Sequence, residues 1–256
     1  MSLPTARIAL SDGPRTLPQE TPVAMVFDGV THAVMMASPA DLEDFAVGFA
    51  LTEGIITARD EITELELVPQ PDGIEARMWL AMDRSAALTA RRRTLAGAVG
   101  CGMCGLDSLA AANRDLPQVG GSLRLTRAQV AGALDLLHTA QPLQDATRAV
   151  HAAGFLTPDG AMTVREDVGR HNALDKLIGA LLRAGMDPAG GAIVITSRVS
   201  VEMVQKTAMA GSPILIAASA PTSYALSLAE GAGITLAASA RGATFDLFTH
   251  PNRIED

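Results

Sequence analysis

Residues 192–238 read AIVITSRVSVEMVQKTAMAGSPILIAASAPTSYALSLAEGAGITLAA, and this stretch decides the fold. Three short apolar runs in it are typical of buried strands: 192–195, 213–218 and 234–238. The segments between them, 201–209 and 223–230, have the spacing of helices, and Glu202 and Lys206 in the first are expected to pair four residues apart. This alternation predicts right-handed βαβ units and a largely parallel sheet covered on both faces.

The pattern continues on both sides of this stretch. Before it, a hairpin at 149–164 turns at Pro158-Asp159-Gly160, and a helix follows at 172–184. After it, a strand at 245–249 closes the set. The first hundred residues predict a smaller α+β unit, because they contain two further hairpins, which turn at Asp28-Gly29 and at Pro71-Asp72-Gly73.

We therefore predict an α/β protein with three parts. Residues 1–100 form a small α+β N-terminal domain, residues 101–141 a cysteine-bearing loop and a helical connector, and residues 142–256 an α/β domain. Three helix starts carry capping signals. Ser38 is expected as an N-cap before Pro39, Thr126 and Gln129 match a capping box, and Asn172 is expected to cap the next helix.

Composition narrows the classes of protein. Of the 256 residues, 48% are hydrophobic and 19% charged, which favours a folded core over disorder. The net charge of −8 and the 3% aromatic content argue against nucleic acid as a partner. The sequence predicts neither a signal peptide nor a membrane span, and two closely spaced cysteines fit a reducing cytoplasm.

The two cysteines stand together in Gly100-Cys101-Gly102-Met103-Cys104-Gly105. Four interpretations compete: half of a zinc site, a thioredoxin-like redox pair, two inert thiols, and a thiol that carries sulfur. Zinc usually needs four ligands, and no histidine pair completes this set, so we expect no resident metal. A glycine-rich loop lets a bulky partner approach closely, which favours the sulfur-carrying thiol.

Polar residues follow the three predicted strands where each strand ends. Thr196, Ser197 and Arg198 come after the first, and Ser239 to Gly242, which include Arg241, come after the third. Ligands of open α/β sheets bind outside the carboxyl ends of the strands. Hydroxyls, helix starts and two arginines at that edge favour a phosphate or diphosphate over capping alone.

Two charged runs remain. Residues 165–171 (REDVGRH) precede the helix at 172–184 and are expected to lie at one end of the sheet. Within this run, His171 is more typical of a structural hydrogen-bonding residue than of a catalyst. Arg91, Arg92 and Arg93 precede the cysteines and are typical of a solvated helix face or of an anion contact.

Five segments resemble one known family. They are DLEDFAVGFALTEGII (41–56), the cysteine motif (100–105), REDVGRHNALDKLIG (165–179), TSRVSVEMVQKTAMAGSPILIAAS (196–219) and RGATFDLFTHPNRI (241–254). They are spread over nearly the whole chain and are similar to the formate dehydrogenase accessory sulfurtransferases, FdhD.

The resemblance implies a function and a fold. Members of that family receive persulfide sulfur from a cysteine desulfurase and pass it to the molybdenum of bis-molybdopterin guanine dinucleotide for formate dehydrogenase. The implied protein is a homodimer with a cytidine-deaminase-like C-terminal domain. Cys101 would carry the sulfur, Cys104 would assist it or be a bystander, and residues Ser239, Ala240, Arg241, Gly242, Ala243 and Thr244 would hold the guanine dinucleotide.

The chain departs from the family and from the zinc deaminases in one respect each. Ser239 stands where the family often has an aromatic residue. Serine offers no stacking contact, so the expected effect is on the strength of guanine binding and not on the presence of the site. The H-x-E and P-C-x-x-C pairs of zinc deaminases are missing, so a deaminase-like fold would carry different chemistry. Two other functions stay open: a non-enzymatic carrier or chaperone of the cofactor, and a thiol–disulfide oxidoreductase.

Overall fold

The computed structural model describes residues 3–11, 13–95, 115–241 and 244–256. Its strands are β1 (Thr5–Ile8), β2 (Arg15–Pro18), β3 (Thr21–Phe27), β4 (Val30–Ala37), β5 (Ile62–Gln70), β6 (Gly73–Leu80), β7 (Leu125–Thr126), β8 (His151–Leu156), β9 (Met162–Asp167), β10 (Ala192–Ile195), β11 (Ile214–Ala217), β12 (Thr235–Arg241), β13 (Thr244–Thr249) and β14 (Ile254–Glu255). Its helices are α1 (Leu42–Thr52), α2 (Met82–Leu95), α4 (Arg127–His138), α5 (Pro142–Thr147), α6 (Arg170–Arg183), α7 (Val201–Ala210) and α8 (Ser223–Ala232).

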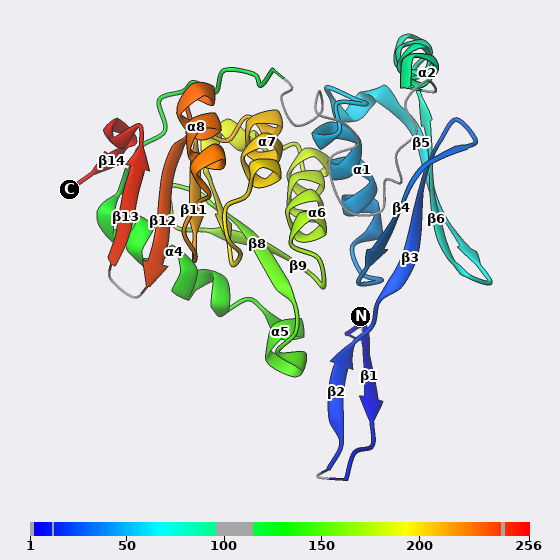
Figure 1. The fold of residues 1–256 in the computed structure, drawn as a ribbon, viewed down its shortest axis with the longest axis horizontal. Helices are drawn as coiled ribbons and strands as arrows, with labels where there is room; N and C mark the ends of the chain where they lie inside the picture. Colours follow the sequence, from blue (N-terminus) through cyan, green and yellow to red (C-terminus); the bar gives the residue numbers. More distant parts are fainter. Residues whose placement is uncertain (1–2, 12, 96–114, 242–243) are drawn as a thin grey trace.

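Two sheets form the body of the molecule. The C-terminal half builds a six-stranded sheet, the N-terminal half builds a four-stranded sheet of order β4-β3-β6-β5, and α1 and α6 lie between them (Figure 1). The hairpin β1–β2 extends away from this body. The mixed α/β architecture confirms the prediction of an α/β protein.

The six-stranded sheet has the order β13-β12-β11-β10-β8-β9. Strands β10, β11 and β12 are parallel as predicted, whereas β8 is antiparallel to both of its neighbours and β13 is antiparallel to β12. The prediction of a largely parallel sheet is therefore wrong. The cause is two short connections, β8–β9 and β12–β13, because strands joined in this way pair antiparallel.

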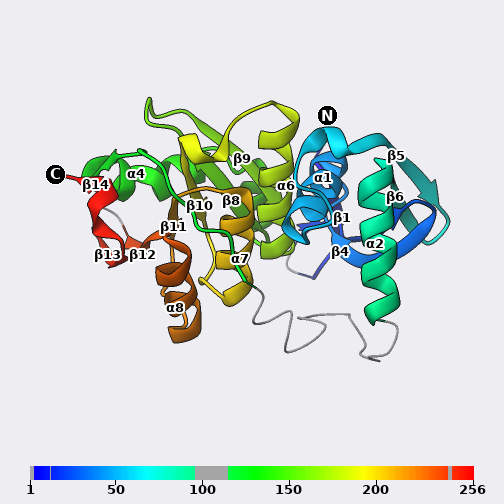
Figure 2. The same ribbon diagram turned by 90° about the horizontal axis from the view of Figure 1, so that it is seen from above.

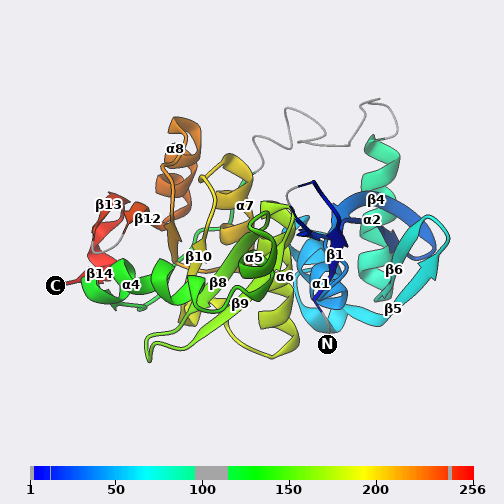
Figure 3. The ribbon, with the colours of Figure 1, turned by 90° about the horizontal axis from the view of Figure 1, so that it is seen from below.

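Helices cover both faces of this sheet. Helices α6, α7 and α8 pack on one face and α4 on the other (Figures 2 and 3). Helix α4 lies in the segment predicted as a connector, and its predicted apolar stripe is buried against the sheet: Val130, Leu134 and Leu137. None of the helices in the described part of the chain is long and apolar enough to span a bilayer.

Both predicted N-terminal hairpins are present. The turn between β3 and β4 has positive φ at Asp28 (50°) and Gly29 (77°), as a tight two-residue hairpin turn requires. The Asp28 carboxylate also accepts hydrogen bonds from the backbone N–H of Leu80 and from the Ser85 hydroxyl. The turn is thereby fixed to β6 and to the start of α2.

One predicted helix start is confirmed and two are wrong. Thr126 and Gln129 form the expected reciprocal capping box. Ser38 lies outside α1, which begins at Leu42, and its backbone N–H donates to the Asp167 carboxylate at 2.9 Å. Asn172 lies inside α6, where it is buried and donates to Asp167 and to the carbonyl of Met36. The Ser38 hydroxyl accepts from the backbone N–H of Val168, so both side chains serve contacts between the two halves of the molecule.

Helices α1 and α6 cross at two glycines. A Cβ atom on Gly48 would lie 1.8 Å from the carbonyl oxygen of Asp175, and one on Gly179 would lie 1.8 Å from that of Asp44. Glycine is therefore required at both positions, because each faces the backbone of the other helix. Ten of the eleven residues of α1 are buried, as is expected of a helix enclosed on all sides.

Two buried lysines tie α6 to its surroundings. The Lys176 ammonium lies 2.6 Å from the Asp167 carboxylate and donates to the carbonyl of Ser38, and neither charged side chain is exposed. The Lys206 ammonium donates to both oxygens of Asp175 and to the Thr52 hydroxyl, all at 2.9 Å. The predicted pairing of Lys206 with Glu202 is thus replaced by a pairing across helices.

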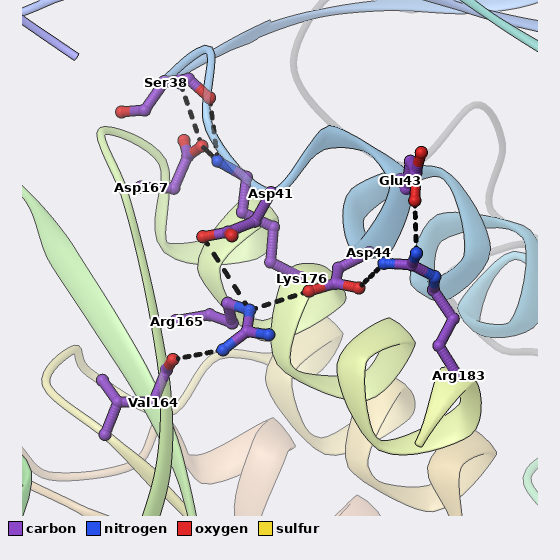
Figure 4. Close-up of polar contacts among 9 residues, drawn as sticks. All are labelled: Ser38, Asp41, Glu43, Asp44, Val164, Arg165, Asp167, Lys176 and Arg183. Atoms are coloured by element: carbon purple, nitrogen blue, oxygen red, sulfur yellow. Dashed lines mark hydrogen bonds and ion pairs between the residues drawn. The ribbon is translucent and has the colours of Figure 1, made fainter. Parts of the chain in front are cut away.

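A third ionic cluster lies nearer the surface. Figure 4 shows the Asp44 carboxylate between two arginines, Arg165 of β9 and Arg183 at the end of α6. Arg183 also binds Glu43, and Arg165 lies 3.8 Å from Asp41. Since Asp44 belongs to α1, this cluster again joins the N-terminal half to the C-terminal half.

Candidate functional site

The loops that follow β10 and β11 lie side by side at one edge of the sheet. The Thr222 N–H donates to the carbonyl of Val199 at 3.1 Å, and Val199 forms a parallel bridge with Pro221. Because β12 is parallel to β11, residues that follow β12 belong to the same edge. The sheet thus brings together the segments that the sequence predicted as an anion site.

The three predicted residues after β10 have different environments. Thr196 hydrogen-bonds the backbone of Ala152 on β8, so its hydroxyl serves the sheet. Ser197 is buried and donates to the carbonyl of Arg198. Arg198 is exposed, which makes it the one member of this trio with a side chain presented to a ligand from solvent.

The predicted segment from Ser239 to Thr244 is partly described, and the prediction that it follows the third strand is wrong, because Ser239 to Arg241 form the end of β12 and Thr244 begins β13. Ser239 has a positive φ of 55° within a β-bulge between Ala238 and Arg241, and Ala240 is buried. A bulge bends its strand and redirects the following side chains, and bulges are common beside functional sites. Arg241 pairs with Thr244, while the Arg241 side chain, Gly242 and Ala243 lie outside the described part of the structure.

The predicted catalytic residues Cys101 and Cys104 also lie outside the described residues. Arg91, Arg92 and Arg93 belong to helix α2, although their side chains are outside the description. The chain downstream of the cysteines is anchored firmly. Val119 N–H donates to the carbonyl of Ala232, and its own carbonyl accepts from Arg253, which is buried.

The contacts of Val119 with Ala232 and Arg253 lie at the edge of the six-stranded sheet opposite the polar loops. Helix α8 leads from the end of β11 to the beginning of β12, so its last residue, Ala232, lies where the strands begin. Arg253 strengthens the anchor through a further hydrogen bond to the carbonyl of Gly233 at 2.8 Å. The chain returns from the cysteine segment at that edge, at Val119, whereas the polar loops lie at the edge where the strands end.

The first turn of α6 adds two residues to the polar edge. Strand β9 is parallel to β10, so α6 begins at the edge where β10 ends. Within the described chain, the Nε atom of Arg170 and the Nε2 atom of His171 are buried and have no hydrogen-bond partner. Buried polar atoms are nearly always paired, so two such atoms in one turn mark a place for water or a ligand.

His171 is neutral at physiological pH. Burial lowers its pKa to about 4, the charges of Arg170 and Lys206 act in the same direction, and those of Glu202 and Glu53 oppose them. A neutral imidazole accepts or donates a hydrogen bond at Nε2 without adding charge to the site. The sequence analysis interpreted His171 as a structural hydrogen-bonding residue. Its burial and its two cationic neighbours keep the imidazole uncharged, which is compatible with that interpretation.

We expect acid to destabilise the protein through His171. The unfolded chain binds a proton there near pH 6.5 and the folded protein only near pH 4, so stability is full above pH 6.5 and falls as the pH drops towards 4. His171→Gln should flatten this decrease by up to about 3 kcal/mol. Urea unfolding at a series of pH values, with exposed His138→Gln as the control, measures it. An unchanged slope in His171→Gln would contradict the assignment.

A shallow cavity of about 340 Å³ lies between α4 and β13, next to the predicted cofactor segment. It is lined by Arg127, Ala128, Ala131, Thr244 and Phe245. Only Thr244 of these was predicted as a site residue. An arginine at the start of one helix and a phenylalanine in a distant strand have no shared pattern in the sequence, so the cavity emerges only from the fold.

Comparison with known proteins supplies the family. The model of the FdhD/NarQ family matches residues 18–255. A protein of Agrobacterium fabrum named sulfur carrier protein FdhD is 51% identical over 97% of this chain and 94% of its own length, and one of Variovorax paradoxus with the same name is 50% identical over 92% and 85%. The crystal structure of a protein from Desulfotalea psychrophila, described as a formate dehydrogenase accessory protein, superposes with a TM-score of 0.74 at 25% identity over 98% of this chain and 97% of that one.

Proposed function

This chain belongs to the FdhD/NarQ family, and from that membership we propose that it carries sulfur for the maturation of a formate dehydrogenase. One observation carries the proposal: identity of about one half, over nearly the whole chain, to proteins named sulfur carrier protein FdhD. The only two cysteines of the chain, Cys101 and Cys104, supply a thiol for that purpose.

We further propose that the protein is a sulfurtransferase. The Cys101 thiolate attacks the outer sulfur of a persulfide on a cysteine desulfurase, which forms the Cys101 persulfide and releases the thiolate of the donor. The acceptor is the molybdenum of bis-molybdopterin guanine dinucleotide, which is the cargo of the protein. We also propose a cytidine-deaminase-like C-terminal domain, a homodimer, and a cytoplasmic location.

The polar edge of the sheet supports a cofactor that contains diphosphate. Arg198 is exposed there, Arg170 and His171 present unpaired buried nitrogens, and the helices α6, α7 and α8 all begin there. Helix N-termini and guanidinium groups both bind phosphate. The proposed cofactor segment, Ser239 to Thr244, extends from the same edge.

Mass spectrometry tests the sulfurtransferase directly. After incubation with a cysteine desulfurase and cysteine, Cys101 should gain one sulfur atom, and the gain should disappear when either the desulfurase or cysteine is omitted. Cofactor binding without any sulfur gain would replace this proposal with a non-enzymatic carrier. A Cys101–Cys104 redox couple that is independent of the desulfurase would indicate a thiol–disulfide oxidoreductase.

We expect Arg241→Ala to weaken the binding of guanosine diphosphate about tenfold or more. A charge-assisted hydrogen bond to phosphate contributes about 1.5–3 kcal/mol, and about 1.4 kcal/mol corresponds to a factor of ten. Titration calorimetry measures the change, and exposed Arg148→Ala is the control for lost positive charge. If Arg241→Ala binds the nucleotide as tightly as the wild type, this residue is outside the site.

A further inference from the structure

The hairpin β1–β2 exposes its apolar face. Ile8 pairs with Arg15 across the two strands, and Leu17 lies two residues further along β2, so these three side chains share one face. The Ile8 and Leu17 side chains are 42% and 46% exposed. Thr16 and Pro18, on the other face of β2, are half-buried. A hairpin that packed on its own chain would bury Ile8 and Leu17 first.

The hairpin has little support from the rest of the chain. Figure 1 shows it extending away from the two sheets, with α5 beside β2. An isolated two-stranded hairpin is only marginally stable in water. Apolar side chains that lie together on a surface mark a place where another surface packs. The apolar face of β1–β2 therefore needs cover from a second molecule.

The four-stranded sheet offers a surface for this purpose. Its inner face belongs to the core cluster that contains α1, through Met25, Met35, Leu65 and Leu67. Side chains alternate along a strand, so Val34 and Met36 of β4 and Glu64 and Glu66 of β5 lie on the outer face. Val34 and Met36 are 52% and 48% exposed, and both glutamates are exposed. The outer face is thus apolar along β4 and acidic along β5.

Strand β4 lacks the protection that edge strands usually carry. It is the first strand in the order β4-β3-β6-β5, and its sequence, VTHAVMMA, contains neither a charged residue nor a proline. Charges and prolines on an edge strand prevent pairing with other chains. An apolar edge without them is an aggregation site unless a specific partner covers it.

The hairpin and the outer face carry opposite charges. Arg7 and Arg15 are exposed in the hairpin and are the only arginine or lysine residues among the first 58. Glu64 and Glu66 give the outer face its negative charge. Opposite charges steer two surfaces together and fix their register. Each chain therefore carries a basic, apolar hairpin and an acidic, apolar sheet face.

We propose that the β1–β2 hairpin is an exchanged arm, whose apolar face packs on the outer face of the four-stranded sheet in a second copy of the chain. Arg15 then lies beside the acidic strand β5 of that copy. The inference rests on the homodimer of the proposed function and adds its interface. Because one chain carries both surfaces, a two-fold axis makes the contact twice and closes the assembly.

Charge reversal on either surface should separate the two copies. Arg15→Glu brings an acidic arm against the acidic face, and Glu64→Arg with Glu66→Arg brings a basic face against the basic arm. A two-fold dimer loses the contact twice, so the dissociation constant of the dimer should rise about a hundredfold or more in each protein. Analytical ultracentrifugation of the full chain over a range of concentrations measures it.

An equimolar mixture of these two proteins is the decisive test. In a mixed dimer the altered arm of one copy meets the altered face of the other, and the two unaltered surfaces also meet. Every contact then joins opposite charges, so the mixture should form dimers although neither protein does so alone. A misfolded variant could not restore the dimer, which makes this result independent of small losses in stability.

A second substitution tests the apolar part of the contact. Ile8→Asp places a charge where the arm packs and should also raise the dissociation constant about a hundredfold or more. The matched controls are Leu136→Asp on α4, where the leucine is 37% exposed, and Arg124→Glu, where the arginine is exposed. Both should dimerise as the wild type does. Circular dichroism shows that each variant is folded.

The outcomes separate this inference from the proposed homodimer. A wild-type dimer with unchanged affinity in Arg15→Glu and Ile8→Asp overturns the arm and leaves the homodimer standing. Two charge variants that stay monomeric when mixed overturn the pairing of the arm with the sheet face. A wild-type protein that is monomeric at micromolar concentration overturns both the homodimer and the arm. Sulfur transfer to Cys101, followed by mass spectrometry, is measured separately from all of these.

Discussion

Cys101→Ala is expected to abolish sulfur transfer and, with it, the formate dehydrogenase activity of cells that depend on this protein. A persulfide can form only on a thiolate, and alanine offers no nucleophile in its place. Gly100 and Gly102 flank Cys101, so its sulfur is the less hindered of the two, whereas Cys104 follows Met103. Complementation of a strain that lacks the protein measures the effect, which should reach the background of the empty strain.

The matched control is Cys104→Ala. It removes the same group three positions away and should cause at most a partial loss of activity, because the proposal assigns the transferable sulfur to Cys101. Both variants should melt at the wild-type temperature, since the sequence predicts a loop for both cysteines and loop residues contribute little core burial. An active, sulfurated enzyme supported by Cys101→Ala would overturn the sulfurtransferase and favour the cofactor carrier.

Gly179→Ala is expected to lower the free energy of unfolding by at least about 3 kcal/mol. The new Cβ would lie 1.8 Å from the carbonyl oxygen of Asp44 and 2.8 Å from the backbone nitrogen of Gly48. These are backbone atoms, so no side chain can turn aside, and α1 and α6 must move apart. That movement strains the hydrogen bond of Asp175 with Thr52, which crosses the same interface at 2.7 Å. Urea unfolding followed by circular dichroism measures the loss.

Gly132→Ala provides the comparison for this prediction. Gly132 also lies within a helix, α4, but a Cβ there would meet nothing within 4 Å. Alanine is the better helix former by about 1 kcal/mol, so this variant should be as stable as the wild type or more stable. Equal stabilities of Gly179→Ala and Gly132→Ala would show that the helix crossing tolerates a methyl group.

The elements with clear patterns were predicted well. Strands β10, β11 and β12 and the helices between them lie within about three residues of their predicted positions, because buried apolar runs and helical spacing are local signals. Local sequence patterns could not predict that β13 runs antiparallel to β12. Its pairing depends on the short connection from β12 and on the bulge at Ser239, which are properties of the assembled sheet.

Polar residues that connect distant segments were predicted worst. Ser38 and Asn172 have the side chains of helix caps, but the Ser38 backbone N–H and the Asn172 side chain both donate to the Asp167 carboxylate, which lies far from Ser38 in the sequence. Lys206 has a helical neighbour of opposite charge in Glu202, yet it binds Asp175. Capping and pairing rules consider only residues a few positions apart, and tertiary contacts overrule them here.

The candidate site was predicted in the same uneven way. Parallel strands place their carboxyl ends together, so Arg198 and the polar loops followed from topology. Thr196 looked like a ligand residue and serves β8 instead. The cavity lined by Arg127 and Phe245 could not be predicted, because it exists only once α4 lies against β13.

The contacts between the two halves also determine when the protein can mature during synthesis. Ser38 bonds a residue 129 positions later, and Thr52 bonds residues 123 and 154 positions later. Contacts of such long range form late and slow the folding of the chain. During synthesis, the polar groups of α1 that are buried in the folded protein stay unpaired until Lys206 has left the ribosome. Cys101 and Cys104 leave the ribosome well before these contacts between the two halves can form. This order gives chaperones a long interval in which to act on the nascent chain.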